Sequence, residues 1–312
     1  MKIIVLESST LGDDISFDKL KKLGDVTIYE ETKQSEMLSR CEDADIIAVN
    51  KLLVNETTLG SEPSVKLVCV TATGTNNIDF DYTNSHNIKV MNAKGYSTDS
   101  VLQHTFACAF YLFEKLSYFD NYVRSGDYAK SSIFTNLNVK FGELKGKTWG
   151  IAGLGTIGKE VARIASAFGC NIIYYSTSGK NNSPVYKRVS FDELLSSSDI
   201  ISINAPLDKN TLNLFNINAF EKMKPTSILI NVGRGSIVNE NDLYTALTEN
   251  KIYGAALDVL SKEPIESDNI LLNFKDSTRL LITPHIAWAS FEARTKLLEQ
   301  TIQNIKNFIN EQ

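Results

Sequence analysis

Short, continuous apolar runs recur along almost the whole chain and alternate with polar or amphipathic stretches. Five such runs lie in the first third of the sequence, at residues 2–7, 26–29, 45–49, 65–70 and 89–91. Five more lie further on, at residues 148–152, 171–175, 200–204, 227–231 and 254–258. Continuous apolar runs suit parallel strands that helices cover on both faces. The sequence therefore predicts an α/β protein with two doubly wound parallel sheets.

Two helical stretches separate the two series of strands. One covers about residues 97–117, and another runs from Trp288 to the end of the chain. A length of 312 residues suits two domains better than one. The simplest arrangement is a discontinuous first domain, residues 1–98 plus 288–312, into which a second domain, residues 99–287, is inserted.

Composition excludes several classes of function. A net charge of −5 and a pI near 5.4 argue against a nucleic-acid surface, which needs clustered basic residues. No uncharged apolar stretch approaches the ~20 residues of a spanning helix, and the short apolar run at the N-terminus indicates a strand. We therefore expect a cytoplasmic protein without a membrane partner. The four cysteines form no C-x-x-C pair, so we expect core residues and no metal site.

A glycine-rich turn follows the strand predicted at residues 148–152. It has the spacing G-x-G-x-x-G, formed by Gly153, Gly155 and Gly158, and it opens a helix predicted over residues 157–168. The first glycine makes a tight turn, the second lets backbone approach a pyrophosphate, and the third lets helix and strand pack closely. The strand–turn–helix context indicates a Rossmann-type dinucleotide-binding domain rather than an unliganded turn.

The acidic residue that usually holds the ribose 2′-hydroxyl is absent. The strand predicted at residues 171–175 is followed by Ser176, Thr177, Ser178, Gly179 and Lys180. A carboxylate here would repel a 2′-phosphate, whereas hydroxyls and Lys180 could accept one. Both NAD and NADP are therefore candidate cofactors, and a polar loop that merely touches adenosine is the alternative.

Three ionisable residues follow successive predicted strands. Arg234 comes directly after residues 227–231, Glu263 follows residues 254–258, and His285 stands in Thr-Pro-His just past a further strand. Ligands of open α/β sheets gather beyond the strand C-termini. A guanidinium can bind a carboxylate with two prongs, and an imidazole oriented by a carboxylate can exchange a proton with a carbonyl oxygen. The set suits reduction of a 2-oxo acid.

The other two histidines have simpler explanations. His86 stands in the polar turn Asn84-Ser85-His86-Asn87, which indicates a solvated loop residue. His104 lies within the long helical stretch, which indicates a position on the helix surface or at an interface.

In order and spacing, the segments 153–158, 231–235, 258–264 and 283–288 resemble the D-isomer-specific 2-hydroxyacid dehydrogenase family. The resemblance covers nearly the whole chain and implies a flavodoxin-like substrate domain and a homodimer whose interface includes the helix near residues 101–117. It implies that Arg234 binds substrate, that Glu263 assists His285, and that His285 is the acid–base. It also implies a set of cofactor contacts, namely Gly153, Gly155, Thr156, Ile157, Gly158, Ser176, Thr177, Ala205, Pro206, Thr211, Val232, Gly233, Arg234, Asp258 and His285.

Segments 50–51, 72–79 and 96–98 resemble the glycerate dehydrogenase (hydroxypyruvate reductase) branch of this family. In that branch the backbone amides of Thr73 and Gly74 would receive the substrate carboxylate, and the substrate set would also include Asn50, Lys51 and Trp288. Hydroxypyruvate or glyoxylate is therefore the expected oxo acid. Residues 92–95 lack the proline often found before the Tyr-Ser-Thr segment, which is a departure from the branch.

Three other interpretations compete with this one. The enzyme could act on another oxo acid, such as pyruvate. A NAD-sensing protein of the corepressor type could share the fold and retain the three ionisable residues. An S-adenosylmethionine enzyme would explain the glycine turn, but it would leave Arg234, Glu263 and His285 without a role.

Overall fold

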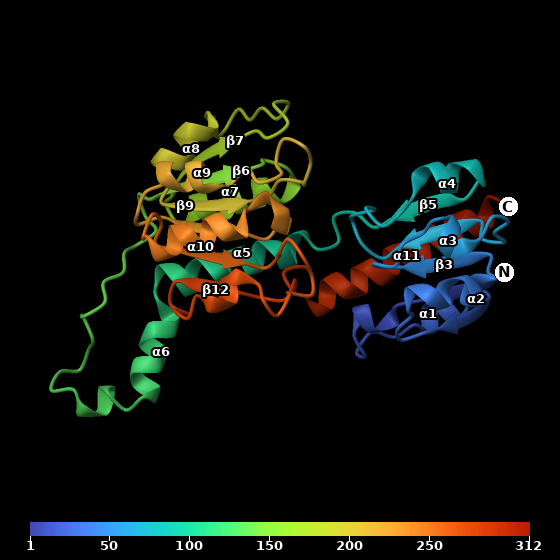
Figure 1. Ribbon diagram of the computed structural model, residues 1–312, viewed down its shortest axis with the longest axis horizontal. Helices are drawn as coiled ribbons and strands as arrows, with labels where there is room; N and C mark the ends of the chain where they lie inside the picture. Colours follow the sequence, from blue (N-terminus) through green and yellow to red (C-terminus); the bar gives the residue numbers. More distant parts are fainter. The chain divides into compact units, whose positions relative to one another are not determined.

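The chain forms two α/β units, the first of which is built from both ends of the sequence. The computed structural model describes residues 1–312. Unit 1 comprises Met1–Ser97 and Trp288–Gln312, and unit 2 comprises Thr98–Ala287 (Figure 1). None of the helices is both long and apolar enough to cross a bilayer.

Unit 1 contains a five-stranded parallel sheet in the order β2-β1-β3-β4-β5. Its strands are β1 (Lys2–Val5), β2 (Asp25–Ile28), β3 (Ile46–Val49), β4 (Leu67–Val70) and β5 (Lys89–Asn92). Its helices are α1 (Asp18–Lys21), α2 (Met37–Cys41), α3 (Glu56–Leu59), α4 (Phe80–Ser85) and α11 (Phe291–Asn310). Strand order reverses between β1 and β3, which is the doubly wound, flavodoxin-like arrangement.

Both faces of this sheet are covered, which explains why its strands are apolar without alternation. Successive side chains of β1 point to opposite faces, so Ile3 and Val5 belong to one core cluster and Ile4 to another. On the first face Leu297, Ile302 and other apolar side chains of α11 pack against the sheet. The Ser290 hydroxyl caps α11 by accepting a hydrogen bond from the Ala293 amide at 3.2 Å. The C-terminal helix therefore completes the N-terminal unit.

Unit 2 contains a seven-stranded parallel sheet in the order β12-β11-β10-β9-β6-β7-β8. Its strands are β6 (Thr148–Ala152), β7 (Asn171–Tyr175), β8 (Lys187–Arg188), β9 (Ile200–Ile203), β10 (Ile228–Asn231), β11 (Gly254–Leu257) and β12 (Leu280–Ile282). Its helices are α5 (Thr98–Phe113), α6 (Leu116–Arg124), α7 (Thr156–Ala167), α8 (Phe191–Ser197), α9 (Ile217–Lys222) and α10 (Glu240–Thr248). The predicted fold of two doubly wound parallel sheets is confirmed.

Helices cover both faces of the second sheet as well. Apolar side chains of α5 and α7 pack on one face, and those of α8, α9 and α10 pack on the other. The strand order reverses between β6 and β9, so the carboxyl ends of these two strands flank the position where such folds bind ligands. Strand β8 is only two residues long and has no apolar run, so hydrophobic pattern gives no sign of it.

The single helix expected over residues 97–117 is two helices. Helix α5 ends at Phe113, Lys115 adopts a left-handed conformation with φ of 58°, and α6 begins at Leu116. The apolar face of α5 packs against its own sheet through residues such as Phe106 and Leu112.

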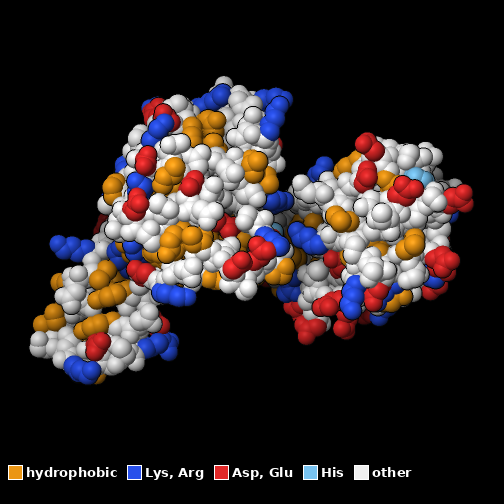
Figure 2. All heavy atoms as spheres, in the orientation of Figure 1, with side chains coloured by type: hydrophobic (Ala, Val, Ile, Leu, Met, Phe, Trp, Pro, Cys, Tyr) orange, Lys and Arg blue, Asp and Glu red, His pale blue; other side chains and the backbone are white.

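After α5 the chain leads away from the sheet (Figure 1). Apolar side chains are exposed along this segment, which we call the arm (residues 116–143); the most exposed are Phe134 at 90% and Leu137 at 72%. Figure 2 shows apolar side chains gathered on this projecting part.

The four cysteines are all buried, which confirms their prediction as core residues. Cys69 lies on β4 and Cys108 on α5, and each packs within an apolar cluster. Burial raises the pKa of the Cys41, Cys69 and Cys108 thiols to about 12 and also raises that of Cys170. The thiolate, which is the reactive form, is therefore scarce at neutral pH.

We expect the folded protein to react very slowly with Ellman's reagent at pH 8. Unfolding in guanidinium chloride should release all four thiols, since burial is what suppresses them. The measurement is absorbance of the released thiolate, with and without denaturant. A thiol that reacts in seconds in the folded protein would contradict the placement of that cysteine in the core.

Candidate active site

The glycine turn joins β6 to α7, and the space available for a side chain differs among its three glycines. Gly153 has a φ of 95°, and a Cβ there would lie 2.9 Å from the backbone of Ala205. A Cβ on Gly158 would lie 2.3 Å from the Gly153 carbonyl oxygen. A Cβ on Gly155 would meet nothing within 4 Å. The first and third glycines are therefore required by packing, while the second leaves bare backbone beside open space.

The start of α7 has the character of an anion site. Gly155 is its N-cap and supplies no side-chain acceptor for the amides of the first turn. Free amides and the helix dipole favour a phosphate group. Beyond β9, the Oδ1 atom of Asn204 is the one buried side-chain polar atom without a hydrogen-bond partner. Bare backbone at Gly155 and an unused acceptor at Asn204 both fit a nicotinamide dinucleotide at this edge. Sequence reasoning missed Asn204.

The loop after β9 is shaped by its own hydrogen bonds. The Thr211 hydroxyl donates to the Pro206 carbonyl at 2.8 Å and accepts from the Asp208 amide at 2.8 Å. Thr211 is fully buried, so it sets the conformation of the turn that follows Ala205. On the other side of β6, Ser176 is also buried, and its hydroxyl accepts a hydrogen bond from the Asn181 amide at 3.2 Å.

The end of β10 presents Arg234. The buried side chain of Asn231 holds the turn, because it donates to the Arg234 carbonyl at 3.0 Å and accepts from the Gly233 amide at 3.1 Å. The guanidinium of Arg234 donates to the Gly233 carbonyl at 2.8 Å and forms no ion pair with any carboxylate. A half-buried cation without an anionic partner is available to an anionic ligand.

The end of β11 places the carboxylate of Asp258 beneath the loop that follows β12. Asp258 is 1% exposed and accepts hydrogen bonds from the Thr283 hydroxyl at 2.7 Å, the Ile286 amide at 2.9 Å and the Ala287 amide at 2.8 Å. Its backbone carbonyl accepts from the His285 amide at 2.8 Å. These bonds hold His285 at a φ of 56°, a conformation rare for a residue with a side chain.

Glu263 fixes the imidazole of His285. The His285 Nδ1 atom lies 2.7 Å from Glu263 Oε2, and the other carboxylate oxygen accepts from the Leu260 amide at 3.0 Å. Both side chains are about one-third exposed, at 29% and 33%. Because Nδ1 is engaged, the second ring nitrogen is the one that can exchange a proton with a ligand. Arg234, Glu263 and His285 thus follow the neighbouring strands β10, β11 and β12.

The other two histidines have side-chain partners that the sequence did not indicate. The His104 side chain is 17% exposed, and its Nε2 lies 3.1 Å from the Thr283 hydroxyl and 3.5 Å from an Asp258 oxygen. Helix α5 packs against β10, β11 and β12, which brings His104 to that loop. His86 lies at the end of α4 with its ring nitrogens 2.9 Å from the Tyr82 carbonyl and 3.0 Å from the Ser61 carbonyl. Helical pattern alone could not reveal either set of partners.

Unit 1 brings its predicted residues to the carboxyl edge of its own sheet. The carboxylate of Glu7, beyond β1, accepts hydrogen bonds from the amides of Asn50 at 2.6 Å and Lys51 at 3.0 Å. The buried side chain of Asn50 donates to the Thr71 carbonyl at 2.9 Å. The Lys51 side chain is exposed. Sequence reasoning missed Glu7, which holds the loop that carries Lys51.

The remaining predicted residues of unit 1 lie at the ends of later elements. Thr73 and Gly74 lie in the loop after β4, where the Thr73 carbonyl accepts from the Asn92 side chain at 2.7 Å. The Trp288 ring meets that of Tyr96 edge-on at 6.3 Å.

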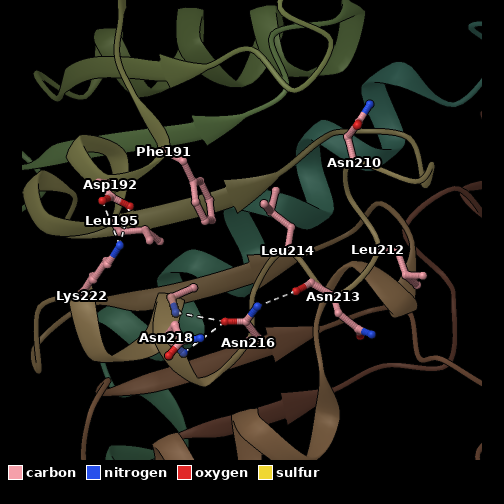
Figure 3. Close-up of a pocket in the computed structure, with 11 residues that line it drawn as sticks. Phe191, Asp192, Leu195, Asn210, Leu212, Asn213, Leu214, Asn216, Asn218 and Lys222 are labelled. Atoms are coloured by element: carbon pink, nitrogen blue, oxygen red, sulfur yellow. Dashed lines mark hydrogen bonds and ion pairs between the residues drawn. The ribbon is translucent and has the colours of Figure 1, made fainter.

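A hollow of about 360 Å³ in unit 2 lies away from these residues, between α8, α9 and the loop before α9 (Figure 3). Its polar groups serve the fold: Lys222 pairs with Asp192 at 2.8 Å, and Asn216 caps α9 by accepting from the amides of Asn218 and Ala219. None of the predicted site residues lines it. The candidate site is therefore the carboxyl edge of the sheet and not this hollow.

The fold and these residues define the class of protein: an oxidoreductase with a nicotinamide dinucleotide domain. Residues 106–287 match the model of the D-isomer-specific 2-hydroxyacid dehydrogenase NAD-binding domain. The chain belongs to the D-isomer-specific 2-hydroxyacid dehydrogenase family, and its relatives support the predicted glycerate dehydrogenase branch.

Three relatives illustrate this placement. A glycerate dehydrogenase of Methylorubrum extorquens is 34% identical over 90% of this chain and 88% of its own. A hydroxypyruvate reductase of Blautia hydrogenotrophica is 34% identical over 99% and 97%. The solved structure of an acyclic imino acid reductase with NADPH and D-Arg has a TM-score of 0.87 at 29% identity and covers 100% of this chain and 98% of its own.

Proposed function

We propose that this protein reduces a small 2-oxo acid to the D-2-hydroxy acid, with hydroxypyruvate or glyoxylate as the preferred substrate. The observation that carries the proposal is the 2.7 Å pair of His285 and Glu263, together with an Arg234 that follows a neighbouring strand and has no carboxylate partner. Relatives named glycerate dehydrogenase, hydroxypyruvate reductase and glyoxylate reductase support the substrate class.

Each residue has a distinct role in this proposal. A reduced nicotinamide, when bound, supplies a hydride. Arg234 binds the substrate carboxylate with two charge-assisted hydrogen bonds. His285 donates its proton to the carbonyl oxygen as negative charge develops there, and in the reverse direction it removes the hydroxyl proton. Glu263 orients the imidazole through Nδ1 and stabilises its charged form.

The remaining site residues would bind the cofactor and the substrate. Backbone at Gly155, Thr156 and Ile157 would hold the pyrophosphate of NAD or NADP. Ala205, Pro206, Val232, Gly233 and Asp258 would line the rest of the cofactor, with Ser176 and Thr177 at its ribose. In unit 1 we propose the amides of Thr73 and Gly74, together with Asn50, Lys51 and Trp288, as substrate-binding groups.

The deciding experiment is turnover, followed by nicotinamide absorbance with NADH and NADPH against hydroxypyruvate, glyoxylate and pyruvate. Acetone, in which a methyl replaces the carboxylate of pyruvate, should be far poorer, because Arg234 would lose its partner. Arg234→Gln should lower kcat/KM for the oxo acid about a hundredfold, since a hydrogen bond to a charged group contributes ~1.5–3 kcal/mol. Arg163→Gln, on the exposed side of α7, is the matched control.

Two outcomes would overturn this proposal. Equal kcat/KM for acetone and pyruvate would remove the carboxylate-binding role, and an L-configured product would remove the stereochemical assignment. Tight dinucleotide binding without turnover of any oxo acid would favour the alternative of a NAD-sensing protein, and a marked preference for pyruvate would favour a different oxo acid.

Substitutions test the pair of His285 and Glu263. Glu263→Gln removes the carboxylate that orients the imidazole through Nδ1, so kcat should fall while KM for the oxo acid stays nearly unchanged. His285→Ala should lower kcat on the order of 10²–10⁴-fold. The measurement is steady-state kcat and KM, with Glu266→Gln as the control in the same loop. An unchanged kcat for Glu263→Gln would remove Glu263 from this role.

We also propose a homodimer. Helix α5 uses its apolar face within its own unit, so the exposed apolar side chains of the arm are the surface that supports self-association. Large exposed apolar patches are uncommon on monomers.

Sedimentation velocity should show a dimer for the wild type and a folded monomer when Phe134 and Leu137 are both changed to Asp. Leu38→Asp, at an exposed apolar position on α2, is the control and should remain dimeric. A wild-type monomer at micromolar concentration would overturn the proposal.

A further inference from the structure

Positive charge without any carboxylate lies in the stretch that contains β7 and the loop after it. Residues 171–191 contain Lys180, Lys187 and Arg188 but no Asp or Glu. Lys187 pairs with Glu193 at 2.6 Å, outside this stretch. Lys180 and Arg188 take part in no ion pair through their side chains. Two of the three cations are therefore available to an anionic ligand.

The fold brings Arg188 to the tip of the loop that follows β7. Strand β8 adds to the edge of the sheet with Arg188 opposite Tyr174, and these two residues lie on the same face. A Cβ built on Gly179, which has a φ of 70°, would lie 4.0 Å from the Arg188 Nη2 atom. Arg188, eight residues later in sequence than Lys180, therefore lies beside the same short loop.

That loop is tied to the glycine turn. The Asn181 amide donates to the Ser176 hydroxyl at 3.2 Å, and the Asn181 side chain donates to the Leu154 carbonyl at 3.3 Å. Leu154 lies inside the G-x-G-x-x-G segment. Lys180 on this loop and Arg188 beside it thus lie near the region where the adenosine ribose lies in a fold of this type.

The side chains around the loop after β7 favour a phosphate group as the ligand. Where an acidic residue ends this strand, it binds the ribose 2′-hydroxyl and repels a 2′-phosphate. Here the buried Ser176 directly follows the strand, and Thr177 and Ser178 offer further hydroxyls. The planar guanidinium of arginine matches a phosphate with two hydrogen bonds, and lysine adds a point charge.

We propose that Arg188, together with Lys180, binds the 2′-phosphate of NADPH and makes this enzyme selective for NADP(H). The inference rests on the proposed dinucleotide-binding function and deepens it. Arg188 is a specificity-determining residue, because it contacts a group that only one of the two cofactors carries.

The test measures binding of 2′,5′-ADP and 5′-AMP, which differ only in the 2′-phosphate, by isothermal titration calorimetry. The wild type should bind 2′,5′-ADP at least ~tenfold more tightly, equivalent to ~1.4 kcal/mol. Arg188→Gln should abolish most of that preference and leave 5′-AMP affinity unchanged. Lys187→Gln is the matched control, since that neighbouring cation is already paired with Glu193. In turnover, Arg188→Gln should lower kcat/KM for NADPH and spare NADH.

Three results would overturn the inference: equal affinity of the wild type for the two nucleotides, equal loss of both on Arg188→Gln, or the same effect from Lys187→Gln. Circular dichroism of each variant excludes unfolding as the cause of a loss. The proposed function fails separately. If the protein binds 2′,5′-ADP through Arg188 but reduces no oxo acid, the phosphate site is supported and the proposed reaction is wrong. If it reduces an oxo acid with NADH alone and shows no preference for the 2′-phosphate, the proposed reaction is supported and the phosphate site is wrong.

Discussion

A buried carboxylate organises the working edge of the second sheet. Asp258 receives the Thr283 hydroxyl and two backbone amides on its side chain, and the His285 amide on its carbonyl. The left-handed backbone of His285 costs ~1–2 kcal/mol relative to an ordinary conformation, so it needs such support. With its backbone held by Asp258 and its ring held by Glu263, His285 has one free ring nitrogen in one place. The proton transfer that we propose for His285 requires preorganisation of this kind.

The parallel sheet explains why this edge can collect so many functional groups. Every strand of unit 2 runs in the same direction, so each connection after a strand opens on the same edge. Arg234, Glu263 and His285 follow three adjacent strands, and the glycine turn follows β6 at the point where strand order reverses. The sheet of unit 1 is also parallel, and Glu7, the loop at Asn50–Lys51 and the loop at Thr73 follow its strands β1, β3 and β4. Each unit therefore presents a set of loops at the carboxyl edge of its own sheet.

The hydrophobic pattern of the sequence predicted the strands and helices that bury apolar surface, but it did not predict those that bury little. The strands and the C-terminal helix were predictable because continuous apolar runs and a helical stripe have no other stable place than a core. Strand β8 was not, because its Lys187 and Arg188 join the sheet through backbone hydrogen bonds alone. The break between α5 and α6 was not predictable either, since it depends on a left-handed Lys115 within an otherwise helical sequence.

The sequence by itself determined the class of fold, the family and the candidate residues Arg234, Glu263 and His285, because spacing and residue type are local properties of the chain. Only the tertiary structure placed His285 2.7 Å from Glu263, His104 beside Thr283, Glu7 beneath the loop of Asn50, and Arg188 beside Gly179. Each of these contacts joins residues from different elements. The distances between these residues depend on the order of the strands in each sheet and on the packing of the helices, and no run of neighbouring residues encodes that geometry.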